Sequence, residues 1–293
     1  MMQHRKHVAM VVGGAVAAAG LSAIALTGSA QASPTHAGAD KVTAAAEAVN
    51  HTEGVKPTVV LVHGAWADAA GWTPVVERLQ AAGYPVIAPP NPLRGLSTDA
   101  AYINSVLKQI KGPIILVGHS YGGAVITNAV MGDANVKALV YIAAFAPAQG
   151  DSLASLNAMP QASQIQPVPA IPSSFPKPDG TTGTELTIDP AKYPTVFLNN
   201  LLPRAQEQAL AVEQRPLSLD SATQPSGTPA WQTTPSWYMV AKQDDAIAPN
   251  LERFMAARAH AHTVEVNGPH LIMVTDPGAV TTLIEKAAKA TTG

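Results

Sequence analysis

Residues 118–122 of this sequence, Gly-His-Ser-Tyr-Gly, place a serine at the centre of a G-x-S-x-G pattern. The pattern follows an apolar run at residues 113–117 and precedes a helical stretch that begins at Gly122. A chain that turns sharply from a strand into a helix needs small residues around the serine, and the turn exposes the hydroxyl group. Since an exposed serine in this context is a nucleophile for acyl transfer, Ser120 is the first candidate catalytic residue.

A serine attacks a carbonyl group only when a neighbouring base takes its proton and an acid orients that base. In this architecture the chain order is serine, then an acid, then histidine. Of the three histidines after Ser120, His260 and His262 flank the end of an expected helix, where histidines commonly contact the last carbonyl groups. His270 lies in a loop after an apolar strand and is therefore the expected general base.

The acid is expected after the strand at residues 236–240, where Asp244 and Asp245 stand side by side. Either carboxylate can accept the imidazole N–H, fix its tautomer and stabilise the imidazolium. The residues themselves leave both candidates open.

Acyl transfer also needs donors that face the developing oxyanion. One expected donor is the backbone N–H of Tyr121, the residue after the nucleophile, and the second is that of Ala65, in the loop after an earlier strand. His63 precedes the nucleophile in the chain and is expected to shape that loop. His119, inside the serine motif, is expected to pack rather than to react.

Short apolar runs alternate with amphipathic segments through most of the chain. The expected strands are residues 58–62, 86–88, 113–117, 136–142, 236–240 and 263–266, and the expected helices are 73–82, 97–110, 122–130, 250–259 and 277–290. Apolar runs without alternation, separated by helices, indicate a parallel sheet covered on both faces. The predicted fold class is therefore α/β with a doubly wound sheet.

The alternation of apolar runs and amphipathic segments stops at residues 147–235. This stretch holds 14 of the 25 prolines, so regular sheet is not expected there. Residues 193–212 are expected to form one or two helices, interrupted at Pro203. An insertion of this length is usually a functional lid or cap. Its apolar residues and few charges predict an uncharged ester with an apolar acyl or alcohol part; these residues are Ile165, Val168, Ile171, Phe175, Phe197, Leu198, Leu201, Leu202 and Trp231. No concentrated set of Arg and Lys residues predicts a phosphate or polycarboxylate site, although Arg94, Arg204 and Arg215 could each be placed near the site.

The composition excludes several classes of protein. Only 13% of the residues are charged, the net charge is −2, and no basic block is present, which argues against nucleic-acid binding. The absence of cysteine excludes a disulfide scaffold, thiolate metal sites and a cysteine nucleophile. No metal or organic cofactor is implied.

The N-terminus begins with a positive cluster, followed by an uncharged run and by Ala30-Gln31-Ala32. This pattern predicts a secretory signal peptide over residues 1–32 and a secreted protein without a membrane anchor after cleavage. Residues 33–54 are expected to be a flexible tail. The catalytic domain is then expected over residues 55–293.

Four motifs in order, V-H-G-A-W, G-H-S-Y-G-G, A-K-Q-D-D-A-I-A-P and V-N-G-P-H, resemble the α/β-hydrolase superfamily. The resemblance spans about residues 58–290 and is to the branch of plant methylesterases, hydroxynitrile lyases and their bacterial esterase relatives. That branch carries its acid in a D-x-x-I pattern, which favours Asp244 over Asp245. The resemblance implies the α/β-hydrolase fold and a small-molecule ester as substrate.

Two positions distinguish between reactions within the branch. Hydroxynitrile lyases of this group carry Thr where this chain has Gly64, and Lys where it has Leu271; both residues here match the hydrolytic pattern. The expected function is a secreted serine ester hydrolase. The alternatives are carbon–carbon lysis by the same triad and a receptor-like protein that binds a small ligand.

Overall fold

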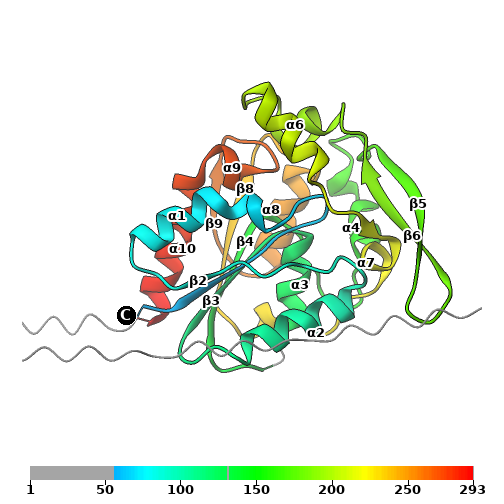
Figure 1. The fold of residues 1–293 in the computed structure, drawn as a ribbon. Helices are drawn as coiled ribbons and strands as arrows, with labels where there is room; N and C mark the ends of the chain where they lie inside the picture. Colours follow the sequence, from blue (N-terminus) through cyan, green and yellow to red (C-terminus); the bar gives the residue numbers. More distant parts are fainter. Residues whose placement is uncertain (1–55, 131, 293) are drawn as a thin grey trace, which may run out of the picture. The chain divides into compact units, whose positions relative to one another are not determined.

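A six-stranded parallel sheet forms the centre of the computed structural model, which describes residues 56–130 and 132–292 (Figure 1). The strand order is β2-β1-β3-β4-β8-β9, so β3 lies inside the sheet between β1 and β4. The strands are β1 (Thr58–Val62), β2 (Val86–Ile87), β3 (Ile114–Ser120), β4 (Val136–Ala144), β8 (Ser236–Ala241) and β9 (His262–Val266). The predicted parallel α/β fold is confirmed. The expected signal peptide and tail lie outside the described residues.

Helices cover both faces of this sheet. They are α1 (Thr73–Ala81), α2 (Leu96–Leu107), α3 (Tyr121–Ala129), α8 (Pro249–Arg258), α9 (Ile272–Thr275) and α10 (Pro277–Thr292). Figure 1 shows α1 and α10 on one side of the sheet and α2 and α3 on the other. The side chains of β1 alternate between the two faces of the sheet. Val59 and Leu61 pack in the core under α1 and α10, whereas Val60 and Val62 pack in the core under α2 and α3. The doubly wound arrangement therefore explains why the strands read as continuous apolar runs.

In residues 56–130 and 132–292, every helix is too short or too polar to pass through a bilayer.

The insertion between β4 and β8 forms a cap. Its elements are α4 (Leu153–Asn157), β5 (Ala170–Pro176), β6 (Thr182–Ile188), α5 (Tyr193–Leu198), α6 (Arg204–Val212), β7 (Leu217–Ser218) and α7 (Leu219–Thr223). The predicted helical stretch at residues 193–212 is confirmed as two helices: α5 ends at Leu198, where Asn199 adopts a left-handed conformation, and Pro203 directly precedes the first turn of α6.

The expectation that residues 147–235 contain no regular sheet was wrong. Strands β5, β6 and β7 form an antiparallel three-stranded sheet, and the β5–β6 hairpin extends away from the main sheet in Figure 1. Pro172 and Pro176 lie in β5, which is an edge strand. An edge strand pairs on one side only, so a proline without an N–H is tolerated there.

The predicted site residues all follow the carboxyl ends of sheet strands. His63 and Ala65 follow β1, Ser120 ends β3, Asp244 follows β8 and His270 follows β9. In a parallel sheet these ends share one edge, which is where open α/β folds place their ligands. The cap elements lie above this edge.

Candidate active site

Ser120 occupies a strained turn between β3 and α3. Its φ of 53° and ψ of −125° lie in a region that non-glycine residues rarely adopt. The glycines on either side permit the turn, because a Cβ on Gly118 would lie 2.6 Å from the Gly122 carbonyl oxygen. A Cβ on Gly122 would in turn lie 2.4 Å from the Val62 carbonyl oxygen. The G-x-S-x-G spacing therefore reflects close contacts between β1, β3 and α3.

His270 and Asp244 form a buried pair. Nδ1 of His270 lies 2.6 Å from Oδ2 of Asp244, and both side chains are almost completely inaccessible. The second oxygen of Asp244 accepts hydrogen bonds from the backbone N–H groups of Ala246 (2.7 Å) and Ile247 (2.8 Å). These bonds hold the carboxylate in place, so Nδ1 of His270 carries the proton and Nε2 is left as the basic nitrogen.

Asp245 differs from Asp244 in its surroundings. Its side chain is exposed, and the hydrogen bond to His270 comes from Asp244 alone. Partial burial raises the pKa of Asp245, and the neighbouring charge of Asp244 adds to the effect. The structure thus brings Asp244, not Asp245, together with His270.

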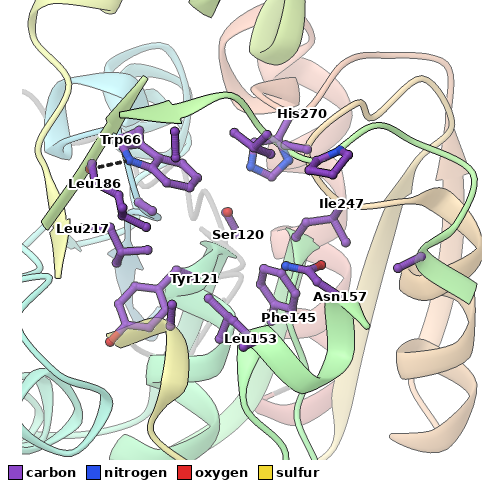
Figure 2. Close-up of a pocket in the computed structure, with 18 of the residues that line it drawn as sticks. Trp66, Ser120, Tyr121, Phe145, Leu153, Asn157, Leu186, Leu217, Ile247 and His270 are labelled. Carbon is purple, nitrogen blue, oxygen red and sulfur yellow. Dashed lines mark hydrogen bonds between the residues drawn. The ribbon is translucent and has the colours of Figure 1, made fainter. Parts of the chain in front are cut away.

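Ala65 and Tyr121 border the same space as Ser120. Tyr121 is the first residue of α3, where backbone N–H groups have no partner within the helix and attract negative charge. The Tyr121 hydroxyl points away from Ser120 in Figure 2 and donates a hydrogen bond of 2.7 Å to buried Asp99. Burial raises the pKa of Asp99. Asp99 was not identified from the sequence. The available signal was its position on the apolar face of an expected helix, where a carboxylate is unusual.

His63 shapes the loop that carries Ala65. Its Nδ1–H donates to the Gly64 carbonyl oxygen at 2.9 Å, and its Nε2 accepts the backbone N–H of Asn91 at 2.9 Å. Burial lowers the pKa of His63 to about 4. The ring is therefore neutral at pH 7 and fixes the loop between β1 and the segment after β2.

His119 supports the backbone of His270 from beneath. It is fully buried, and its Nε2 donates to the His270 carbonyl oxygen at 3.0 Å. The two rings lie 4.6 Å apart. Burial, followed by the neighbouring His270, lowers the pKa of His119 well below its ordinary value, so its ring stays neutral. His119 contacts the base without facing the cavity.

A cavity of about 290 Å³ lies between this sheet edge and the cap. Figure 2 shows the Ser120 hydroxyl pointing into it, with His270 bordering the same space. The other walls are mainly apolar: Trp66, Phe145, Leu153, Ile165, Val168, Leu186, Leu217 and Ile247. Among the residues that the structure describes, no Asp, Glu, Lys or Arg lines it. Arg94 forms an ion pair with Glu185 of the cap at 2.6 Å.

Trp66 joins the sheet domain to the cap. Its indole Nε1–H donates to the Leu186 carbonyl oxygen of β6 at 2.8 Å (Figure 2). Its own carbonyl oxygen accepts the Tyr193 hydroxyl at 2.8 Å, and its N–H donates to the Arg215 carbonyl oxygen. Three cap segments therefore fix the loop that follows β1, next to the Ser120 side of the cavity.

The sequence matches a known protein family. The sequence model that describes the alpha/beta hydrolase family matches residues 59–283 of this chain. The chain belongs to this family. A carbendazim hydrolyzing esterase of Nocardioides sp. (strain SG-4G) is 36% identical over 110 residues, which cover 33% of this chain and 46% of that relative. The match thus spans about half the length of that relative.

Two solved structures share the fold. The structure of polyneuridine aldehyde esterase matches with a TM-score of 0.67 at 18% sequence identity. The match covers 79% of this chain and 98% of the esterase chain. The structure of a pyrethroid hydrolase from Sphingobium faniae JZ-2 matches with a TM-score of 0.63 at 21% sequence identity. That match covers 80% of this chain and 98% of the hydrolase chain. These likenesses confirm the predicted α/β-hydrolase fold.

Gly64 gives a prediction from packing alone. A Cβ at this position would lie 2.5 Å from the Cβ of Ser120 and 3.1 Å from its Oγ, so Gly64→Ala must displace the nucleophile. Since a shift of about 1 Å can cost about 100-fold in rate, kcat/KM for ester hydrolysis is expected to fall by about that factor. Gly278→Ala is the control, because a Cβ there would make an ordinary contact of 3.6 Å. Equal activity of both variants would contradict this geometry.

Proposed function

We propose that this protein is a carboxylic ester hydrolase that acts through an acyl-enzyme on Ser120. The observation that carries the proposal is the buried His270–Asp244 pair beside a strained, cavity-facing serine. A nucleophile, a base and an orienting acid in this order are the components of serine-dependent acyl transfer. Relatives named as an esterase and as a hydrolase agree with this class of activity.

In this mechanism Ser120 Oγ attacks the carbonyl carbon of the ester while Nε2 of His270 accepts its proton. Asp244 keeps Nδ1 protonated and stabilises the imidazolium that forms. The imidazolium then gives its proton to the leaving alcohol. Water, activated by the same nitrogen, hydrolyses the acyl-enzyme and restores Ser120.

The oxyanion formed in both steps is assigned to the backbone N–H groups of Ala65 and Tyr121. Both residues border the cavity next to Ser120, and Tyr121 begins α3. Donors held by the backbone need no rearrangement during the reaction. The Tyr121–Asp99 hydrogen bond and the loop contacts of His63 fix the two segments that carry these donors.

The substrate is proposed to be an uncharged ester with an apolar acyl or alcohol part. The cavity walls support this choice, since they are apolar and offer no ionic partner among the described residues. Of the apolar residues of the insertion, Ile165 and Val168 line the cavity, whereas Ile171 and Leu201 face solvent. Export is proposed from the N-terminal sequence, and the N-terminal residue of the exported protein, expected to be Ser33, tests it.

Turnover of a matched series of p-nitrophenyl esters tests the substrate class. Uncharged acyl groups are expected to give a kcat/KM at least about 10-fold higher than acyl groups of similar size that end in a carboxylate, because burying an unpaired charge is costly. Initial rates measured with the enzyme lacking residues 1–32 give this ratio. No turnover of any ester would contradict the proposed activity, while a preference for the carboxylate series would contradict only the substrate class.

A further inference from the structure

Glu252 is a second buried carboxyl group near the candidate triad. It lies on α8, the helix that follows the loop of Asp244, and its side chain is 0% exposed. Its Oε2 accepts the backbone N–H of Ala241 at 3.3 Å. The side chain of Asp244 lies within hydrogen-bonding reach of the same carboxyl group. Two carboxyl groups thus meet behind His270, away from the cavity.

The surroundings of Glu252 do not fit a carboxylate. Oε1 receives no hydrogen bond from any donor in residues 56–130 and 132–292. No Lys, Arg or His in the same part of the chain forms an ion pair with Glu252. The charged and titratable groups that face it are Asp244, Tyr238 and Arg253, and Arg253 is exposed and paired with Glu265 at 2.7 Å.

A protonated carboxyl group fits the same surroundings. Its O–H supplies the donor that Asp244 accepts, and its carbonyl oxygen keeps the bond from Ala241. Burial raises the pKa of Glu252 well above its ordinary value, and the charge of Asp244 raises it further. Asp244 then accepts from two backbone N–H groups, from His270 and from Glu252.

We propose that Glu252 is a positioning residue whose protonated carboxyl group donates a hydrogen bond to Asp244 and keeps this carboxylate aimed at His270. The inference rests on the proposed function, because Glu252 acts on the reaction only through Asp244 and His270. A neutral donor stabilises the Asp244 anion without adding a charge beside it. An ionised glutamate at this position would instead repel Asp244.

The test compares Glu252→Gln with Glu252→Leu in ester hydrolysis. Glutamine reproduces a protonated glutamate, since its amide donates to Asp244 and its carbonyl oxygen accepts from Ala241; kcat and KM are expected to stay within about threefold of wild type. Leucine removes the donor, and kcat is expected to fall by about 10- to 100-fold at unchanged KM. Glu207→Gln is the matched control, because Glu207 is a buried glutamate of the cap that accepts the Leu202 N–H and does not line the cavity.

The pH profile of kcat/KM separates positioning from a purely structural role. Its acidic limb reports protonation of the catalytic base. Without the donor, the Asp244 carboxylate is less well aimed at His270 and stabilises the imidazolium less, so the acidic limb of Glu252→Leu is expected at lower pH than that of wild type. The limb of Glu252→Gln is expected to stay in place. A shifted limb or lost activity in Glu252→Gln overturns the proposal, as does wild-type behaviour of Glu252→Leu.

Thermal unfolding supplies a readout that does not depend on activity or on Glu252→Leu folding. The raised pKa of Glu252 means that the folded protein keeps a proton which the unfolded chain loses above the ordinary glutamate range. The Tm of wild type is therefore expected to fall relative to Glu252→Gln as pH rises from about 5 to about 8. A constant Tm difference overturns the protonated state. Activity in Ser120→Ala would contradict the proposed function itself, whereas an inactive Ser120→Ala beside an unaffected Glu252→Leu rejects the role of Glu252 alone.

Discussion

Replacing Ser120 with alanine is expected to lower kcat for ester hydrolysis by about 10⁴- to 10⁶-fold. The substitution removes the only atom that can form the acyl-enzyme in the proposed mechanism. Steady-state rates on an uncharged p-nitrophenyl ester, with enzyme concentrations high enough to detect slow turnover, measure the loss. The residual rate is expected to reflect binding and the oxyanion donors, since His270 and Ala65 remain in place.

Ser236→Ala is the matched control for this variant. Ser236 is also a buried serine, but it begins β8 and donates its hydroxyl to the Thr234 carbonyl oxygen, away from the cavity. Its kcat is expected to stay within about threefold of wild type. Substantial turnover by Ser120→Ala, or an equal loss in both variants, would show that Ser120 is not the nucleophile.

The second large effect is expected from Asp244→Asn, with a loss of about 10³- to 10⁴-fold in kcat. The backbone N–H groups of Ala246 and Ile247 require an acceptor, so the amide oxygen of the asparagine faces them. The amide NH₂ then faces Nδ1 of His270 and donates to it. The proton moves to Nε2, and the ring can no longer accept the proton of Ser120.

Asp245→Asn removes the adjacent carboxylate and leaves this arrangement intact. Because Asp245 is exposed and has no hydrogen bond to His270, its kcat is expected to stay within about threefold of wild type. Comparison of kcat for the two variants under identical conditions decides between the aspartates. A larger loss in Asp245→Asn would overturn the assignment of the acid.

The sequence predicted the residues that local chain geometry determines. Ser120 was recognisable because a strand, a glycine-flanked serine and a helix must follow one another in sequence. His270 followed from chain order, since it was the only remaining histidine in a loop after an expected strand. The choice between Asp244 and Asp245 came from a family pattern, because both stand in the same loop and only packing around Ala246 and Ile247 separates them.

The cap was harder to predict, since its structure depends on contacts between distant segments. The prolines of β5 argued against a sheet, but a strand on an edge needs only one side for pairing. The cavity is lined by segments up to 205 residues apart along the chain, from Ala65 to His270. No local pattern determines how such segments meet.

Buried carboxyl groups around the site were also missed. Asp99 and Glu252 lie on the apolar faces of α2 and α8, and a polar residue on such a face was the available sign. The periodicity shows that these carboxyl groups are buried, but their partners, Tyr121 and Asp244, come from other elements. Only the three-dimensional arrangement connects them to Ser120 and His270.

The most direct test of the proposed mechanism is the site of covalent capture. The enzyme is treated with an uncharged fluorophosphonate, which reacts with activated serines, and the modified peptide is identified by mass spectrometry. One equivalent is expected on Ser120, with labelling abolished in Ser120→Ala and strongly slowed in Asp244→Asn. Labelling of another residue, or equal labelling rates in wild type and Asp244→Asn, would contradict a nucleophile activated by the His270–Asp244 pair.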